Sequence, residues 1–84
     1  MDDPLKDPKT QLQEYLQGKQ LPLPKYDVLG IEGSAHEQLF SIRCTVKDIE
    51  HSIVGQGGSR RIAEQEAAAQ ALKLLGIGLE LGEE

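Results

Sequence analysis

The chain has 84 residues, with 9 basic and 14 acidic side chains and a formal net charge of −5. This length allows one small domain with a single hydrophobic core. No apolar run approaches the roughly 18 residues that a membrane-spanning helix needs, so we expect no membrane partner. The single cysteine, Cys44, excludes an intrachain disulfide, and the acidic, proline-containing start is unlike a signal peptide. We therefore expect a cytoplasmic protein.

The negative charge is concentrated at the two ends of the chain. Between Pro8 and Gly76 there are eight basic and eight acidic residues, so the body of the sequence is neutral. A protein that binds nucleic acid usually has a basic surface. Net charge alone therefore decides nothing about a nucleic-acid partner, and the positions of the basic residues matter instead.

The first structured element is predicted to be a helix after a linker over residues 1–6. Asp7 and Pro8 suit the N-cap and first helical position, and Gly18 is expected to cap the other end. The spacing of Leu12, Tyr15 and Leu16 gives one apolar stripe. The opposite face of this helix is polar and consists of Thr10, Gln13, Glu14 and Gln17.

Three strands are predicted next, because prolines at 22 and 24 prevent the helix from continuing. Their expected bounds are Lys25–Ile31, Leu39–Val46 and His51–Gly55. The second strand alternates most clearly, with the inward positions Phe40, Ile42, Cys44 and Val46. The expected loops, over residues 33–37 and 47–50, are short. Short connections indicate a three-stranded antiparallel sheet.

The last predicted element is a helix that begins after Ser59 as N-cap and ends near Leu75, before Gly76. Its apolar stripe consists mainly of alanines and leucines, at Ala63, Ala67, Ala68, Ala71, Leu72 and Leu75. The predicted order is α-β-β-β-α, an α+β domain over residues 7–76 with both helices packed on one face of the sheet. Residues 77–84 are expected to form a frayed or disordered tail.

The stretch GQGGSRR, Gly55 to Arg61, places two arginines in the first turn of a helix. Cations are disfavoured there, because the N-terminus of a helix carries partial positive charge. Glycines that let the backbone turn, followed by free helix N–H groups, make an anion site. Phosphates bound at this point would offset the cost of placing Arg60 and Arg61 at the positive end of the helix.

Two other interpretations of the same stretch remain. On spacing alone, a glycine-rich strand exit followed by two solvated arginines accounts for the pattern equally well. A nucleotide-binding loop fits less well, because Arg60 occupies the third glycine position of G-x-G-x-x-G and the P-loop spacing is absent. We therefore expect no small-molecule substrate.

The sequence resembles the double-stranded RNA-binding domains, and it is most similar to the C-terminal domain of bacterial ribonuclease III. The resemblance covers residues 7–75 in three ordered segments, KTQLQEYLQGK, LPLPKYDVLGIEGSAHEQLFSIRCTV and VGQGGSRRIAEQEAAAQALKLL. Domains of this family span roughly 16 bp of duplex and recognise A-form shape and 2′-hydroxyls more than sequence.

The resemblance implies three RNA-binding segments in this chain. The outer face of the first helix meets a minor groove, here with Thr10, Gln13, Glu14 and Gln17. The loop between the first two strands enters the next minor groove, here with Ser34, Ala35 and His36. The start of the last helix holds phosphates of the intervening major groove, here with Gly58, Ser59, Arg60 and Arg61.

Several residues depart from the family pattern or are expected to play ordinary roles. Many members carry a third basic residue where this chain has Glu64, with Glu66 close by. Glu64 suits a helix start but lowers the positive charge, so we expect modest RNA affinity and contact with few phosphates, through the arginines and Lys9 or Lys25. Cys44 is expected in the core and His51 on the surface. The histidines and the cysteine share no metal-ligand spacing.

The resulting hypothesis is a module that binds double-stranded RNA for a ribonuclease III enzyme that processes structured and ribosomal RNA. This chain is expected to contain no catalytic residues and to need no cofactor. The resemblance implies that Mg²⁺ and the catalytic carboxylates belong to another domain, through which the parent enzyme forms a homodimer. The alternative is a protein-interaction module of the same fold that has lost RNA binding, although such versions tend to lose the basic pair that is present here.

Overall fold

The computed structural model describes residues 7–47 and 49–76. Its elements follow the order α1 (Pro8–Gly18), β1 (Lys25–Ser34), β2 (Glu37–Val46), β3 (Ile49–Gly57) and α2 (Arg60–Leu75). The predicted α-β-β-β-α order is therefore confirmed. The linker expected over residues 1–6 and the tail expected over residues 77–84 lie outside the described residues.

The strands form one antiparallel sheet in the order β1-β2-β3. Each strand is longer than the sequence predicts. Gly33, Ser34 and Glu37, expected in a loop, belong to the strands, and Ser34 pairs directly with Glu37. The turn of the β1–β2 hairpin therefore consists of Ala35 and His36 alone. Gly33 has a φ of 96°, a conformation that glycine adopts without strain, which lets the pairing continue up to the turn.

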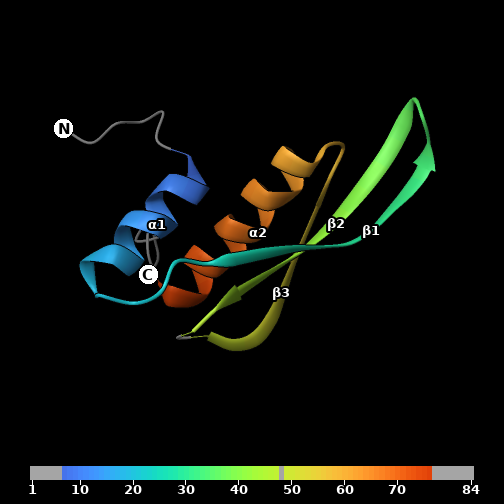
Figure 1. The fold of residues 1–84 in the computed structure, drawn as a ribbon. Coiled ribbons are helices and arrows are strands. Elements are labelled where there is room, and N and C mark those ends of the chain that lie inside the picture. Colours follow the sequence, from blue (N-terminus) through green and yellow to red (C-terminus); the bar gives the residue numbers. More distant parts are fainter. Residues whose placement is uncertain (1–6, 48, 77–84) are drawn as a thin grey trace.

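Both helices pack on the same face of the sheet, as predicted, and Figure 1 shows them side by side. The buried cluster contains residues of both helices and of the sheet. Leu12 and Leu16 come from α1, Cys44 and Ile53 from the sheet, and Ala67 from α2. Burial of these aliphatic groups provides the main favourable contribution to folding. The core therefore fixes the position of both helices relative to the sheet.

Two glycines of β3 allow α2 to approach the sheet closely. A Cβ atom at Gly55 would lie 2.3 Å from the backbone nitrogen of Ala67 and 2.4 Å from the carbonyl oxygen of Ala63. A Cβ at Gly57 would lie 2.4 Å from the side chain of Ile62. Gly55 lies in the third strand as predicted, whereas Gly57 continues that strand instead of forming the expected turn. Their role is to leave space for the helix.

The helix ends follow local capping rules with one exception. The Asp7 carboxylate accepts a hydrogen bond from the Thr10 N–H at 2.9 Å, and the Ser59 hydroxyl accepts one from the Ile62 N–H at 3.1 Å. Gly76 caps α2 in the left-handed conformation. Gly18 is the last helical residue of α1 rather than its cap, because the N–H of Lys19 still donates to carbonyls of the last helical turn.

Cys44 and His51 lie where the sequence predicts. His51 is exposed on β3, and Cys44 is fully buried on the inner face of β2. Burial raises the pKa of the Cys44 thiol to about 11, against a smaller opposite effect of the neighbouring Tyr26 hydroxyl. The Tyr26 hydroxyl is itself buried, and burial raises its pKa. Both groups are therefore neutral near pH 7.

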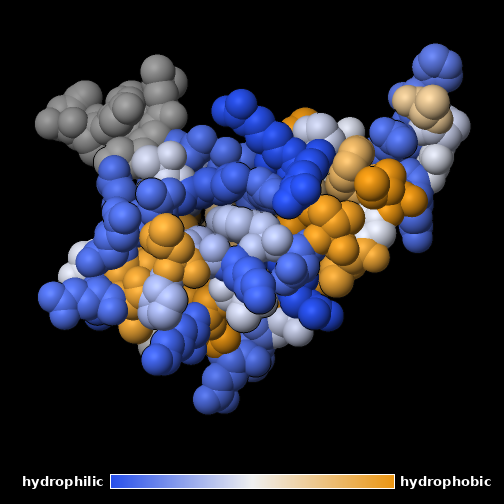
Figure 2. Space-filling model, viewed as in Figure 1, coloured by the Kyte–Doolittle hydropathy of each residue, from blue (hydrophilic) through white to orange (hydrophobic). Residues whose placement is uncertain are grey.

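The β1–β2 hairpin extends beyond the start of α2 (Figure 1). Val28 and Ile31 are consequently 41% and 51% exposed, although their strand partners Ile42 and Phe40 are better covered. Figure 2 shows an apolar area between α2 and this hairpin, and a hydrophilic band from the start of α1 to the start of α2. The polar and apolar parts of this surface are thus adjacent but distinct.

Candidate nucleic-acid interface

The outer face of α1 presents the polar residues that the sequence predicts. Leu12 and Leu16 are buried in the core. The residues of the opposite face are all exposed, namely Thr10, Gln13, Glu14 and Gln17. Glutamine amides can both donate and accept hydrogen bonds. This face can therefore contact hydroxyl groups and base edges without adding charge.

The tip of the β1–β2 hairpin is a second, separate set of exposed residues. Ser34 ends β1, and Ala35 and His36 form the turn. All three are exposed and lie at the far end of the hairpin, well away from α1 (Figure 1). A projecting two-residue turn of this kind can enter a groove that a flat sheet surface cannot.

The start of α2 is the third set. Gly58 and Arg61 are exposed, and the side chain of Arg60 is 58% exposed. Ser59 is only partly exposed, and its hydroxyl caps the helix by accepting from the Ile62 N–H. Guanidinium groups at the N-terminus of a helix are of the kind that can bind phosphate oxygens.

A groove between α1 and α2 brings two of these sets together. Its volume is about 540 Å³, and it is lined by Asp7, Lys9, Thr10, Gln13, Arg60, Arg61, Glu64 and Gln65. The groove therefore joins part of the polar face of α1 to the arginines of α2. The groove is not lined by Glu14, Gln17, Gly58, Ser59 or the hairpin residues. The predicted interface therefore has one part along the groove and another part at a distance from it.

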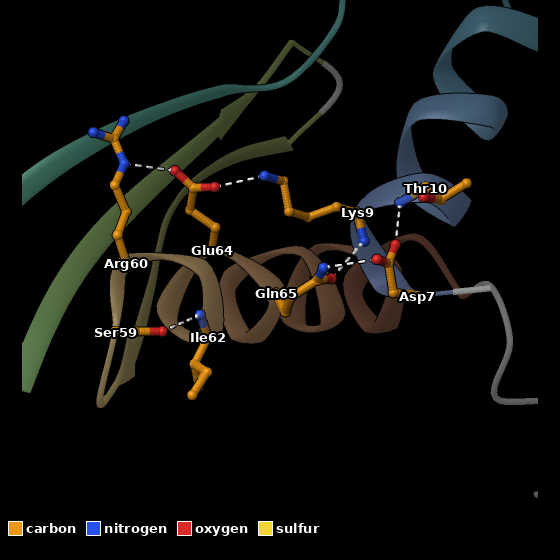
Figure 3. Close-up of polar contacts among 8 residues, drawn as sticks. All are labelled: Asp7, Lys9, Thr10, Ser59, Arg60, Ile62, Glu64 and Gln65. Atoms are coloured by element: carbon orange, nitrogen blue, oxygen red, sulfur yellow. Dashed lines mark hydrogen bonds and ion pairs between the residues drawn. The ribbon is translucent and has the colours of Figure 1, made fainter. Parts of the chain in front are cut away.

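A network of polar contacts, here called the junction, forms the floor and walls of this groove (Figure 3). It consists of Asp7, Lys9, Arg60, Glu64 and Gln65. Glu64 accepts from Lys9 Nζ at 2.5 Å and from Arg60 Nε at 2.8 Å. Gln65 accepts from the Lys9 N–H at 3.0 Å and donates to Asp7 at 2.8 Å. The junction thus connects the first turn of α1 to the first two turns of α2.

Glu64 is the buried centre of the junction, since only 8% of the residue is exposed. Burial alone would raise the pKa of its carboxyl group, but hydrogen bonds and charge from Lys9 and Arg60 outweigh burial and lower the pKa. The pKa of Asp7 is also lowered, first by the Thr10 N–H and then by the side chains of Thr10 and Gln65. Both carboxylates are ionised near pH 7.

The structure assigns Lys9 and Glu64 roles that the sequence did not predict. Glu64 was expected to suit the start of the helix while lowering the positive charge, but it lies in the second turn of α2 and forms two ion pairs. Lys9 or Lys25 was expected to add a phosphate contact. The Lys9 amine pairs with Glu64 and lies 5.1 Å from the ring centre of Tyr26. Lys9 therefore serves first to hold the two helices together.

Part of the junction could have been found from the sequence. Arg60 and Glu64 have the i, i+4 spacing of an ion pair on a helix, and Asp7 has the position of a helix cap. The contacts of Lys9 with Glu64 and Gln65 span 55 and 56 residues. No local pattern reports such pairs, because only the packing of α1 on α2 brings them together.

Residues 8–75 match the family model described as the double-stranded RNA binding motif. The chain belongs to this family. The three exposed sets described above are therefore carried by a double-stranded RNA-binding domain, and double-stranded RNA is its ligand class. The fold predicted from the resemblance is confirmed.

Curated relatives of this double-stranded RNA-binding domain are bacterial enzymes. It is 57% identical over 72 residues to Ribonuclease 3 of Glaesserella parasuis serovar 5 (strain SH0165) and 59% identical over 73 residues to Ribonuclease 3 of Pasteurella multocida (strain Pm70). These matches cover 86% and 87% of this chain. The chain spans about a third of the length of either relative, 32% in both cases.

Solved structures of similar domains support the same family. One is a structure of Arabidopsis HYL1 described with its implications for miRNA processing, with a TM-score of 0.70 and 35% identity over 82% of this chain and 96% of that one. Another is the crystal structure of the dsRBD domain of a tRNA-dihydrouridine(20) synthase. Its TM-score is also 0.70, with 27% identity over 89% of this chain and 77% of that one.

The helices and the metal-ligating side chains of the described residues bear on membranes and metals. None of the helices within residues 7–47 and 49–76 is long and apolar enough to cross a membrane. Over the same ranges, no group of three or more histidine, cysteine, aspartate or glutamate side chains is placed to hold a metal ion.

Proposed function

We propose that this domain binds the substrate of a ribonuclease III enzyme, and that it does so along one face of an RNA duplex. The observation that carries the proposal is the groove in which Arg60 and Arg61 lie beside Thr10 and Gln13. The two arginines offer charge for phosphates, and Thr10 and Gln13 offer neutral polar groups for a minor groove. This combination suits a duplex whose backbone and shallow groove are contacted together.

The proposed binding mode assigns one part of the duplex to each exposed set. The face of α1, with Thr10, Gln13, Glu14 and Gln17, contacts one minor groove. The hairpin tip, with Ser34, Ala35 and His36, contacts the next minor groove. The start of α2, with Gly58, Ser59, Arg60 and Arg61, contacts the phosphates between them. The separation of hairpin tip and α1 in Figure 1 suits two successive grooves.

The proposed phosphate contacts are few. Arg61 is exposed, and Arg60 is mostly exposed, whereas Lys9 is paired with Glu64. Each phosphate that a protein neutralises adds about one to the slope of log affinity against log salt. We therefore expect a shallow salt dependence and modest affinity, which would suit a module whose role is to position RNA rather than to bind it alone.

The same proposal extends to the enzyme of which this domain would be a part. The enzyme cuts structured RNA, including ribosomal precursors, with Mg²⁺ and carboxylates of a separate catalytic domain through which it forms a homodimer. The identity to two Ribonuclease 3 proteins supports this proposal. The cytoplasm is the proposed location.

A binding titration tests the proposed function. The chain is titrated with an RNA duplex of about 20 bp, longer than the roughly 16 bp that such a domain spans, and with a DNA duplex of the same sequence. A shape and 2′-hydroxyl contact mode predicts clear preference for RNA. Equal weak binding to both duplexes would indicate that the arginines attract nucleic acid only through their charge. Binding to neither would contradict the proposal and favour a protein-interaction module.

A further inference from the structure

We propose that Glu64 is a positioning residue for RNA binding, which holds the guanidinium group of Arg60 so that its two terminal nitrogens face a phosphate. The inference rests on the proposed function, since it concerns how that phosphate site is built. An acidic residue in a phosphate-binding region would ordinarily be expected to repel RNA. The geometry around Glu64 points to the opposite role.

The first observation is the atom through which Arg60 is held. Glu64 accepts from Nε of Arg60 at 2.8 Å. The two terminal nitrogens of the guanidinium point away from Glu64 in Figure 3. These nitrogens carry four of the five N–H donors of an arginine side chain. One planar group can therefore keep its bond to Glu64 and present a pair of parallel donors to phosphate oxygens.

The second observation is that Glu64 itself is shielded from the surrounding solvent. Its side chain is 11% exposed, whereas that of Arg60 is 58% exposed. Both residues line the groove, but the guanidinium presents much more of its surface to an approaching phosphate than the carboxylate does. The carboxylate is mostly covered, so it contributes little to the surface that the proposed RNA backbone would contact.

The third observation is that Lys9 offsets the charge of Glu64. The Lys9 amine pairs with the second carboxylate oxygen, so one negative charge lies between two positive charges. Arg60, Glu64 and Lys9 together retain a net positive charge. The cost of burying a carboxylate is offset by two ion pairs, and its repulsion of a phosphate is reduced because its partners are closer to it than any ligand.

Arg61 shows what Glu64 changes. It is exposed and lines the same groove, and its charge helps to lower the pKa of Asp7, but within residues 7–47 and 49–76 no hydrogen bond or close ion pair fixes the orientation of its guanidinium. Ordering a long side chain on binding costs about 0.5–1.5 kcal/mol. Arg61 would pay this cost when RNA binds, whereas Arg60 is already oriented. We infer that Arg60 is the more geometrically specific of the two phosphate contacts.

The test is a double-mutant cycle on RNA affinity in the full 84-residue chain. Glu64→Gln removes the charge with little change in volume, and the titration uses an RNA duplex of about 20 bp. We expect about twofold to tenfold weaker binding, which corresponds to losing the orientation of one arginine side chain. In an Arg60→Ala background the same substitution should have less than about a twofold effect.

Glu66→Gln is the matched control, because it removes the same charge from an exposed position two residues along the same helix. We expect the affinity of this variant to stay within about twofold of the unaltered chain. Tighter binding of Glu64→Gln would show that Glu64 only repels RNA and would overturn the inference. An equal loss with and without Arg60 would also overturn it, since Glu64 would then act through the fold.

A second variant tests the inference even if Glu64→Gln destabilises the fold. Arg60→Lys keeps Glu64 and the charge, but a lysine amine lacks the planar fork that can pair with a carboxylate and a phosphate together. We expect weaker RNA binding by about twofold to tenfold, with only a small fall in melting temperature, because the altered ion pair involves a mostly exposed arginine. Unchanged affinity would overturn the inference. Absence of RNA binding by the unaltered chain would instead contradict the proposed function itself.

Discussion

The junction and the hairpin tip are built in opposite ways, although both belong to the proposed RNA interface. In the junction, side chains from two helices are fixed by hydrogen bonds and ion pairs around the buried Glu64. At the hairpin, residues 31–39 are all exposed, and strand pairing alone positions the backbone. One region has its side chains arranged before any ligand binds, and the other has only its backbone arranged.

This difference separates two contributions to binding. A preorganised group loses little conformational entropy when a ligand binds, whereas an exposed flexible side chain must be ordered at that moment. Substitutions in the junction should therefore change both stability and RNA affinity. Substitutions at the hairpin tip should change affinity alone, because no described core contact depends on those side chains.

The largest expected effect comes from removing both arginines of α2. Arg60→Ala together with Arg61→Ala should weaken RNA binding about tenfold to a hundredfold, because each lost phosphate contact at an exposed arginine is expected to cost about 0.7–1.4 kcal/mol, the range of a typical hydrogen bond. The loss should be uniform across RNA sequences, and the salt slope should fall by about two. Titrations at several salt concentrations measure both quantities. Unchanged affinity would contradict the phosphate-site assignment.

Lys9→Met tests the structural side of the junction. The substitution keeps an aliphatic side chain near Tyr26 but removes the ion pair with Glu64. We expect the free energy of unfolding to fall by about 1 kcal/mol, the usual contribution of a hydrogen bond to a charged group after allowance for partial exposure. Chemical denaturation measures this value. Lys25→Met is a control on an exposed lysine of β1 and should leave stability unchanged.

Acidification tests the ionised state of the same carboxylates. The folded-state pKa of Glu64 lies below its ordinary value of 4.5, and that of Asp7 below 3.8. Their contribution to stability is therefore complete above these ordinary values and is lost as the pH falls through the lower folded values. We expect constant stability from about pH 7 to 5 and a decline below about 4.5. A Glu64→Gln variant with an identical decline would contradict this assignment for Glu64.

His36→Ala is expected to have the smallest effect and to mark the contrast with the junction. Loss of one polar contact in a groove should weaken RNA binding about threefold. The melting temperature should not change, since the side chain is exposed in the turn of the hairpin. Calorimetry and a binding titration together check both statements. A clear fall in melting temperature would show that the tip also contributes to the fold.

Local signals made the helices predictable, whereas pairing between distant residues limited the prediction of the strands. Ser59 and Gly76 are recognisable caps, and α2 lies between them as expected. The extra pairing of Ser34 with Glu37 depends on cross-strand hydrogen bonds that no local pattern reports. The role of Gly55 was also missed, because only the position of α2 shows that a side chain there would collide with its backbone.

The candidate site was predictable to a similar degree. The exposed face of α1 follows from helical periodicity, and the resemblance to the family supplied the three proposed RNA-binding segments. The environment of Glu64 could not be predicted, because its partner Lys9 lies 55 residues away in the sequence. From the sequence, Glu64 only lowers the positive charge of a basic segment. The packing of α1 on α2 shows that it pairs with Lys9 and Arg60.

The central claim is that three separate segments of one face contact the RNA, and NMR tests it most directly. The isotopically labelled chain is titrated with an RNA duplex of about 20 bp, and amide signals are followed residue by residue. The account predicts perturbed signals in residues 10–17, 34–36 and 58–61, with the outward strand residues Arg43 and Val54 unaffected. Perturbation centred on the outer face of the sheet, or confined to the arginines of α2, would contradict it.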